Sequence, residues 1–398
     1  MKRYVIVGNG AAGACAAEEI RARDAAGSIV VFSTEDLPHY YRPRLADYMA
    51  GEASLESFTL KNLAWYQERR VDLRLGESVT SIDLERKEAL GDKSGATGYD
   101  ALLIASGASC FLPPVKGSDK AGVFTLRGAA DAQAIARAAA GASCAAVIGG
   151  GLLGLEAARA LIALGLKVEV IELADRLLPR QLDGAGAAFL QSALEKMGFS
   201  FRLSAKTSEI AGEGVAREVV LEDGRRVACG LALFSAGARP NLELARAAAL
   251  DIGAAIKVDK NMRASAPGIW AAGDVAEYEG RPCGAWPVAM AQGKIAGASM
   301  AGATLDYVPE HPAMMLKVAG VSMISAGEID AEGALASKVF SSPGAYRKIV
   351  LDGDVIKGAI FLGSIDGAWQ CVAAMNAGKR LGALAKDIGD EDFDWARI

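Results

Sequence analysis

Residues 3–23 read RYVIVGNGAAGACAAEEIRAR, and residues 144–161 repeat the same plan as CAAVIGGGLLGLEAARAL. Each stretch is an apolar run, then three glycines at G-x-G-x-x-G spacing, then an alanine-rich segment with helical periodicity. The apolar runs predict strands that are buried on both faces. The glycines and the segments after them predict tight turns into helices. Two such strand–turn–helix units indicate an α/β chain with two Rossmann-like domains.

The three glycines of this motif have separate physical roles. The first allows a tight turn, the second leaves room for a pyrophosphate beside the backbone, and the third lets the helix pack closely on the strand. The helix N-terminus offers unpaired N–H groups and about half a positive charge to the phosphates. An acidic residue after the next strand accepts hydrogen bonds from the ribose hydroxyls. Each unit is therefore predicted to bind a dinucleotide.

Both units contain all of these parts. The first has Gly8, Gly10 and Gly13, with Glu35 as the acid and Asp36 as the alternative. The second has Gly149, Gly151 and Gly154, followed by Glu172. A carboxylate at Glu172 would repel a 2′-phosphate, so the sequence favours NAD(H) over NADP(H), with Arg176 nearby as the opposing feature.

Composition excludes several other functions. The chain has 398 residues, of which 52% are hydrophobic and 23% charged, so we expect two or three folded domains. A net charge of −5 argues against nucleic acid or an anionic membrane as the main partner.

Gly8 interrupts the first apolar run too early for a secretory signal, so we expect a cytoplasmic protein. The six cysteines show no C-x-x-C or cluster spacing and there are two histidines, so no metal site is predicted.

The order of patterns predicts an inserted domain. Residues 1–117 and 239–309 form the first dinucleotide domain, because the strand and Gly-Asp turn in GIWAAGDVAE return to it. Residues 118–238 form the second domain, which is inserted in the first. Residues 310–398 form a small α+β domain of antiparallel strands and one helix, which we expect to be an interface domain. Its acidic end, DIGDEDFDWARI, is expected to be a solvated tail.

At this level the sequence resembles the FAD-dependent pyridine nucleotide–disulfide oxidoreductase superfamily. YDALLIASGA, SAGARPN, GIWAAGDVAE and the Gly154-Leu155-Glu156 triplet resemble motifs of that family. The resemblance implies FAD on the first loop and NAD(H) on the second. For FAD it implies Gly8, Gly10, Gly13, Glu35, Arg42, Pro43, Val79, Ala105, Gly107, Gly273, Asp274 and Trp286. For NAD it implies Gly149, Gly151, Leu152, Leu153, Gly154, Glu156, Glu172 and Gly237, with Glu156 as the catalytic residue beside the nicotinamide.

Some of these residues also have plain structural interpretations. Glu156 is a carboxylate that a helix N-terminus favours in any case. Trp286 is equally well explained by core packing, and Arg42 by a position in a surface loop. Five basic residues are candidate contacts for an acidic carrier protein, although a solvated surface position is the preferred interpretation for each: Arg44, Arg69, Arg70, Lys317 and Lys348.

The chain departs from the disulfide reductases where they carry redox cysteines. After the first acidic strand it reads HYYRPRLADYMAGE, without a cysteine. Cys15, on the first predicted helix, is expected in the core. HYYRPRL and ADRLLPRQLD instead resemble NADH:rubredoxin reductases and the N-terminal part of nitrite reductase large subunits. Oxygenase-linked ferredoxin reductases have a lysine at the position of Asp47 and match less well.

The resemblance therefore implies an oxidoreductase that transfers hydride between NADH and FAD and single electrons between FAD and a carrier. The carrier would be rubredoxin or an iron–sulfur protein. One alternative is an NAD-coupling FAD subunit of a larger iron–sulfur complex, for example a 2-oxoacid:acceptor oxidoreductase, working with partner subunits and able to run toward NAD⁺ reduction. A second alternative is a non-catalytic flavin-binding module.

Overall fold

The computed structural model describes residues 1–309, 313–318 and 320–398, and these fall into two compact units. The first unit comprises Met1–Arg42, Ser54–Ser109 and the segment that starts at Ala238. The second comprises Pro43–Ala53, Cys110–Gly237 and the C-terminal segment that ends at Ile398. The short segment Pro43–Ala53 thus belongs with the second unit, although the sequence on both sides of it belongs to the first.

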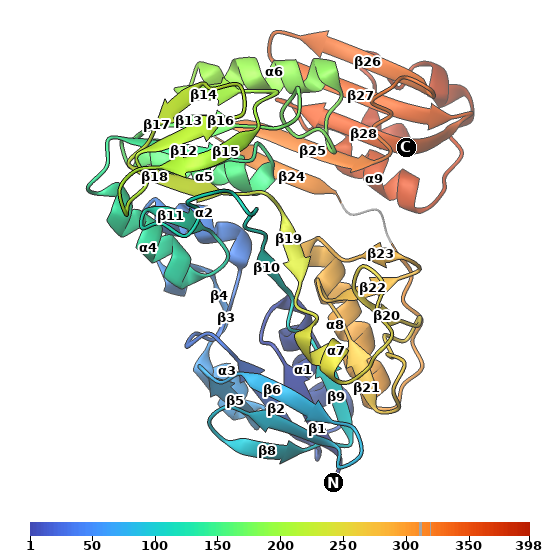
Figure 1. Cartoon of the computed structure of the whole chain (residues 1–398). Helices are drawn as coiled ribbons and strands as arrows, with labels where there is room; N and C mark the ends of the chain where they lie inside the picture. The colour runs from blue at the N-terminus through green and yellow to red at the C-terminus, as the bar shows by residue number, and fades with distance from the viewer. Residues whose placement is uncertain (310–312, 319) are drawn as a thin grey trace. The chain divides into compact units, whose positions relative to one another are not determined.

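The first unit is built on a parallel sheet with the strand order β21-β9-β1-β2-β5 (Figure 1). Its strands are β1 (Arg3–Val7), β2 (Ser28–Ser33), β5 (Val71–Leu75), β9 (Ala101–Ile104) and β21 (Ile269–Ala271). Strand β21 comes from the segment after the second glycine motif and pairs with β9. The return of the chain to the first sheet, which the sequence indicates from GIWAAGDVAE, is therefore confirmed.

Both faces of this sheet are buried, as the apolar run predicts. Tyr4 and Ile6 of β1 belong to a core shared with helices α1 (Ala11–Arg23), α3 (Leu63–Glu68) and α8 (Trp286–Met300). Val5 and Val7 point to the opposite core, which is closed by the antiparallel sheet β6-β7-β8 and helix α7 (Glu243–Ala247). That small sheet contains β6 (Val79–Asp83), β7 (Glu88–Gly91) and β8 (Gly95–Gly98).

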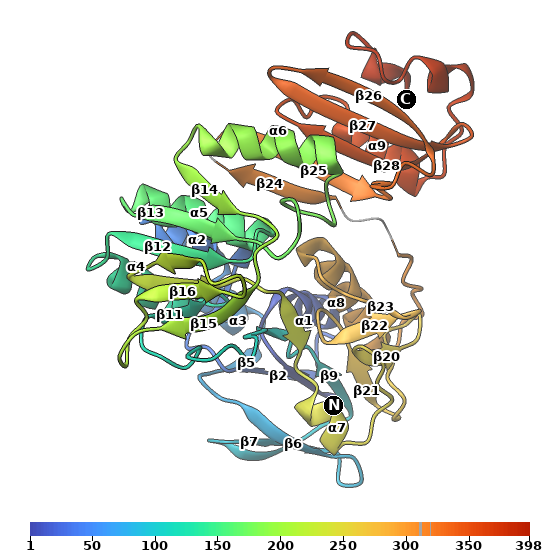
Figure 2. The ribbon, with the colours of Figure 1, turned by 45° about the horizontal axis from the view of Figure 1, so that its top comes forward.

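Helices α1 and α8 pack side by side because small residues line their contact (Figure 2). A Cβ atom on Gly297 would lie 2.6 Å from the carbonyl oxygen of Ala16, and one on Gly293 would collide with the backbone of Ala12. The two glycines are four residues apart and so share one helix face. Their lack of side chains lets α8 approach the helix that follows the first glycine loop.

The second unit repeats this architecture. Its parallel sheet has the order β11-β18-β12-β13-β14 and is accompanied by the antiparallel sheet β15-β16-β17. The parallel strands are β11 (Val123–Thr125), β12 (Cys144–Ile148), β13 (Lys167–Ile171), β14 (Phe199–Arg202) and β18 (Leu231–Phe234). The small sheet contains β15 (Thr207–Ala211), β16 (Glu218–Leu221) and β17 (Arg226–Ala228), and its last hairpin turns at Gly224, which has φ +86°. The helices are α2 (Leu45–Met49), α4 (Ala129–Ala139), α5 (Leu152–Ala163) and α6 (Gly184–Glu195).

The C-terminal part of this unit is an antiparallel sheet, β24-β25-β28-β27-β26, with helix α9 (Ala368–Asn376) packed on it. Its strands are β24 (Met314–Val318), β25 (Val321–Gly327), β26 (Ala336–Ser342), β27 (Ala345–Asp352) and β28 (Val355–Leu362).

The remaining short strands of the chain are β3 (His39–Tyr40), β4 (Thr59–Lys61), β10 (Ala108–Cys110), β19 (Ala238–Pro240), β20 (Ile256–Val258), β22 (Ala276–Tyr278) and β23 (Arg281–Pro282).

Two expectations about the C-terminal part are wrong. The acidic end is not a solvated tail: Ile388 and Phe393 are buried in the domain core, and the ring of Trp395 packs edge-on against Phe393. Apolar side chains spaced between the acidic ones fill that core. The expectation of a solvated tail is based on the charges and does not take these apolar residues into account. Lys348 is not at the surface either, because it is buried beside Asp183, with an Nζ–Oδ2 distance of 3.4 Å. The side chain of Lys317 lies outside the described residues.

Candidate dinucleotide sites

The first glycine loop follows β1 and leads into α1. Gly8 has φ +111°, and a Cβ atom there would collide with the carbonyl group of Ala105 at the end of β9. A Cβ atom on Gly13 would collide with the carbonyl group of Gly8. Around Gly10, by contrast, a Cβ atom would meet nothing within 4 Å. Two of the glycines are thus required by the fold, and the middle one borders open space.

The second loop has the same geometry. Gly149 has φ +119° and approaches the backbone of Ser235, at the end of β18, in the way that Gly8 approaches Ala105. Gly154 packs against the carbonyl group of Gly149, and Gly151 borders open space. The roles that the motif assigns to its three glycines therefore recur in both units.

Both loops lie where an α/β sheet binds ligands. In each sheet the strand order reverses between two neighbouring strands. These are β1 and β9 in one unit, and β12 and β18 in the other. Ligands of open parallel sheets bind at the carboxyl ends of the strands at this point of reversal. The first N–H groups of α1 and α5 have no partners within their helices, and the space above Gly10 and Gly151 is open. This backbone cradle fits the pyrophosphate of a dinucleotide in each unit.

The two predicted acids lie just after the strand that follows each glycine motif, β2 in one unit and β13 in the other. Glu172 accepts hydrogen bonds from the N–H groups of Gly150 (2.6 Å) and Ala174 (2.8 Å), so its carboxylate is fixed against the second loop. Glu35 accepts from the hydroxyl of Tyr40 (2.7 Å) and from Nη2 of Arg42 (2.5 Å). Arg42, predicted near FAD, is thus paired with the predicted ribose acceptor.

The other residues predicted to bind FAD lie in the first unit, with one exception. Gly107 has φ +68° and its carbonyl accepts from the N–H of Asn241, while the N–H of Gly273 donates to Gln292 on α8. Val79 begins β6, Asp274 follows Gly273, and Trp286 begins α8. Pro43 falls in the second unit. The residues predicted to bind NAD, namely Gly149, Gly151, Leu152, Leu153, Gly154, Glu156, Glu172 and Gly237, are all in the second unit.

Glu156 lies in the second turn of α5, near charged groups that sequence analysis did not identify as its neighbours. Burial, together with the negative charge of Asp47, raises the pKa of Glu156 to about 7, and Arg159 opposes this shift. Arg159 forms ion pairs with Asp47 (2.9 Å) and Glu52 (2.7 Å). This ion-pair network ties the segment 43–53 to α5. Neighbouring charges on one helix face are visible in sequence, but their partners more than 100 residues away are not.

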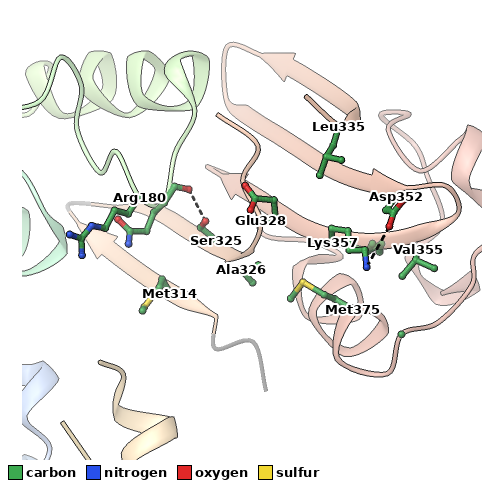
Figure 3. A pocket seen from close by; sticks show the side chains of 14 residues that line it. Arg180, Met314, Ser325, Ala326, Glu328, Leu335, Asp352, Val355, Lys357 and Met375 are labelled. Atoms are coloured by element: carbon green, nitrogen blue, oxygen red, sulfur yellow. Dashed lines mark hydrogen bonds and ion pairs between the residues drawn. The ribbon is translucent and has the colours of Figure 1, made fainter. Parts of the chain in front are cut away.

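A separate cavity of about 750 Å³ lies elsewhere in the second unit (Figure 3). It is bordered by Arg180 and Gln181, by strands β25 and β28, and by α9. Lys357 and Asp352 pair across one side of it at 3.6 Å, and Ser325 donates to the carbonyl of Gln181. None of the residues predicted to bind a cofactor lines this cavity. The cavity therefore adds nothing to the two dinucleotide sites.

The cysteines in the described residues are all free thiols. Cys15 is buried on α1 as expected, and burial raises the pKa of its thiol. Burial likewise raises the pKa of Cys283 to about 12 and that of Cys371 to about 12. These thiols are kept protonated at neutral pH, which makes them poor nucleophiles.

Comparison with known families agrees with this geometry. Residues 2–293 match the model of the pyridine nucleotide-disulphide oxidoreductase family. The chain belongs to this family. Residues 312–379 also match the C-terminal domain of rubredoxin NAD⁺ reductase. Proteins of this class are oxidoreductases that use FAD and NAD(H), so the fold, the class of enzyme and the two cofactors predicted from the sequence are confirmed.

Several curated relatives are similar over most of the chain. A nitrite reductase of Bacillus subtilis is 38% identical over 91% of this chain and 46% of its own length. An assimilatory nitrate reductase electron transfer subunit of the same organism is 36% identical over 91% of this chain and 48% of its own length. The chain thus spans about half the length of these two relatives. The ferredoxin–NAD⁺ reductase component of the biphenyl dioxygenase system of Paraburkholderia xenovorans is 32% identical, over 96% of this chain and 92% of that protein.

Solved structures show the same fold. A NAD-dependent persulfide reductase from A. fulgidus superposes with a TM-score of 0.90 at 29% identity, over 96% of this chain and 78% of that one. NADH:rubredoxin oxidoreductase from Clostridium acetobutylicum superposes with a TM-score of 0.82 at 27% identity, over 96% of both chains. Among the described residues no helix has the length and apolar character needed to cross a membrane.

Proposed function

We propose that the chain is an FAD-dependent oxidoreductase that takes hydride from NADH and passes single electrons to a protein carrier. Rubredoxin and small iron–sulfur proteins are the carriers of matching chemistry. The observation that supports this most is the combination of two glycine cradles with a segment, Arg42–Ala53, that contains no cysteine. We assign FAD to the first cradle and NADH to the second, following the family resemblance of the surrounding motifs.

Bound FAD supplies chemistry that no side chain provides, because it accepts two electrons together and can release them singly. The protein has to bind and orient the reactants. Gly10 and the N-terminus of α1 would hold the pyrophosphate of FAD, and the N-terminus of α8, which begins at Trp286 and Pro287, would offer its N–H groups to negative charge on the isoalloxazine ring. Orientation supplies most of the rate advantage of hydride transfer, since no general acid or base is required.

On the nicotinamide side, Gly151 and the N-terminus of α5 receive the pyrophosphate of NADH, and Glu172 accepts from the adenosine ribose. Glu156 is the residue that orients the nicotinamide. With a pKa of about 7, its carboxyl group is present in both protonation states at neutral pH, and in the protonated state it donates a hydrogen bond as well as accepting one. Protonated Glu156 is therefore able to bond the carboxamide of the nicotinamide in either of its orientations.

Anaerobic stopped-flow spectroscopy tests the proposal. The protein is reduced with one equivalent of NADH and mixed with rubredoxin, with a two-iron ferredoxin, or with a low-molecular-weight disulfide or persulfide. We expect one of the one-electron carriers to reoxidise it at least 100-fold faster than either sulfur substrate. Faster reoxidation by a sulfur substrate would refute the proposal and would place the chain functionally beside the persulfide reductase that it resembles.

A second candidate is the electron-entry portion of a larger reductase. It is favoured by the two Bacillus subtilis relatives, which match 91% of this chain and extend well beyond it. In that case the electrons leave to redox centres of other domains or subunits. Co-purification from the native host distinguishes the two, because a stable assembly favours the second candidate and a freely exchanging carrier the first.

A further inference from the structure

The two glycine loops differ at the residue between their first two glycines. The second loop has Gly150 there, whereas the first has Asn9, which is held by two side chains from distant parts of the chain. Nδ1 of His39 lies 3.1 Å from the carbonyl oxygen of Asn9. The hydroxyl of Tyr66 donates to Oδ1 of Asn9 at 2.7 Å. Strand β3 and helix α3 thus both contribute a hydrogen bond to the first loop.

The partner of His39 fixes the tautomer of its ring. A carbonyl oxygen accepts hydrogen bonds and cannot donate them, so Nδ1 has to carry the proton. Residue His39 is 5% exposed, and its ring stacks on the indole of Trp286, with a centroid separation of 5.6 Å and an interplanar angle of 8°. It is therefore restrained on its face as well as at Nδ1.

The surroundings of His39 keep the ring uncharged at neutral pH. Burial lowers its pKa to about 4, and the hydrogen bond to Asn9 opposes that shift. The charged groups that face the ring are Lys61 and Arg42, which lower its pKa, and Glu18, which raises it. The phenol of Tyr66 also lies close, and burial raises its pKa, so it remains a donor. Between pH 5 and pH 9 the ring therefore keeps a single proton.

A bond to the carbonyl of Asn9 also orients the N–H of Gly10. The two groups belong to one planar trans peptide, so they point in opposite directions and turn together. Gly10 is the N-cap of α1 and borders the open space of the cradle. A donor on the Asn9 carbonyl therefore holds the Gly10 N–H in one direction before any ligand arrives, and such preorganisation lowers the cost of binding.

Packing alone does not explain an asparagine at this point. Its Nδ2 is buried and has no hydrogen-bond partner in the part of the chain that the structure describes, and burying an unpaired donor destabilises the fold. The second loop avoids that cost with a glycine. An unpaired donor of this kind is tolerated where the other atoms of the residue have a task.

We propose that His39, with its proton on Nδ1, is a positioning residue for FAD: together with Tyr66 it preorganises the first glycine loop so that the Gly10 N–H meets the pyrophosphate. The proposal rests on the assignment of FAD to this loop. It also distinguishes the two loops. The corresponding carbonyl of the second loop, on Gly150, accepts from the backbone N–H of Leu178 at 3.3 Å, so that loop uses no histidine for this bond.

The test measures the dissociation constant of FAD for the apoprotein by quenching of flavin fluorescence. His39→Phe keeps the stack on Trp286 and removes the donor, and Tyr66→Phe removes the other donor. We expect each to weaken FAD binding about three- to tenfold, the range of one hydrogen bond. His39→Asn places an amide N–H where Nδ1 was and should recover most of the affinity, whereas His39→Gln, whose amide mimics the other ring nitrogen, should not. The dissociation constant of NADH is the matched control and should stay within about twofold for all variants.

Nitrogen-15 NMR of histidine-labelled apoprotein reads the tautomer directly and does not depend on activity. The chain has two histidines, so His311→Gln assigns the remaining signal to His39. We expect Nδ1 to have the shift of a protonated ring nitrogen at pH 7. An unprotonated Nδ1, or His39→Phe protein that binds FAD as the wild type does, would overturn the inference. Wild-type apoprotein that binds no FAD would instead refute the proposed function.

Discussion

The guanidinium of Arg159 lies 2.9 Å from the carboxylate of Asp47 and joins helix α5 to helix α2. The side chain of Arg159 is 17% exposed, and its other nitrogen pairs with Glu52, so both carboxylates of the segment 43–53 converge on it. Disulfide-containing members of the family, as the resemblance implies, carry their redox cysteines in this segment. Here the segment instead carries an ion-pair network that ends beside Glu156.

The first prediction concerns this network. Arg159→Gln removes the cation that lowers the pKa of Glu156, so that pKa should move above about 7. It also leaves Asp47 and Glu52 without their shared partner. We expect the KM for NADH to rise about three- to tenfold and kcat to change less, because a ground-state contact is being disturbed. Steady-state kinetics with ferricyanide as acceptor measure this. Arg159→Lys, which keeps the charge but not the forked geometry, should be intermediate, and an unchanged KM in both variants contradicts the prediction.

The second prediction is a pH dependence set by Glu156. Its folded-state pKa of about 7 is above the ordinary value of 4.5, so the folded state holds a proton that the unfolded state has lost between these values. Stability should therefore fall as pH rises from about 4.5 to about 7, by at most about 3 kcal/mol, and level off above. Glu156→Gln should lack this component. Urea unfolding at pH 5 and pH 8 measures it, and parallel pH profiles for wild type and variant would count against it.

The third prediction concerns the middle glycine of each loop and its effect on the binding of each cofactor. Gly10 and Gly151 have extended backbone angles and open surroundings, so alanine at either position should fold normally. The added methyl group would occupy the space of a pyrophosphate. Gly10→Ala should weaken FAD binding at least tenfold and spare NADH, and Gly151→Ala should do the reverse. Equilibrium binding measures both. Gly13→Ala is the contrasting variant, because its Cβ collides with the backbone of Gly8 and should lower the stability of the fold itself.

The fourth prediction addresses the choice of nucleotide. Glu172→Gln removes the negative charge that would face a 2′-phosphate, so the preference for NADH over NADPH, as a ratio of kcat/KM, should fall about tenfold. Arg176 is the matched control. It pairs with Asp175 at 3.0 Å and donates to the carbonyl of Leu182, so Arg176→Met should leave the ratio nearly unchanged. A large change in this ratio with Arg176→Met and none with Glu172→Gln would contradict the prediction, because Arg176 would then determine the preference.

The strand–turn–helix units could be predicted because the spacing of residues within each unit determines its structure. Helix α1 (Ala11–Arg23) follows the first glycine turn as expected, and the hairpins at Gly224 and Gly353 turn where glycine supplies a positive φ. Both glycine loops follow from spacing, since the first and third glycines of each loop meet backbone atoms and the middle one borders open space.

Contacts across long sequence distances were not predictable in the same way. Arg159 and Asp47 are 112 residues apart, and Lys348 meets Asp183 across 165 residues, so no periodicity links either pair. The buried position of Phe393 and the packing of the partly buried Trp395 depend on a core built from β28 and α9, which charge patterning does not reveal. His39 and Asn9 were both inside quoted motifs, but a hydrogen bond between them becomes visible only when β3 is placed beside the first loop.

The central claim is that FAD is the sole redox centre of this chain and that NADH reduces it without a thiol relay. Anaerobic titration with NADH, followed by absorbance, tests this most directly. The account predicts complete bleaching of the flavin by one equivalent of NADH per chain, that is, two electrons. Consumption of a second equivalent, together with a stable long-wavelength band from a thiolate beside the flavin, would contradict it.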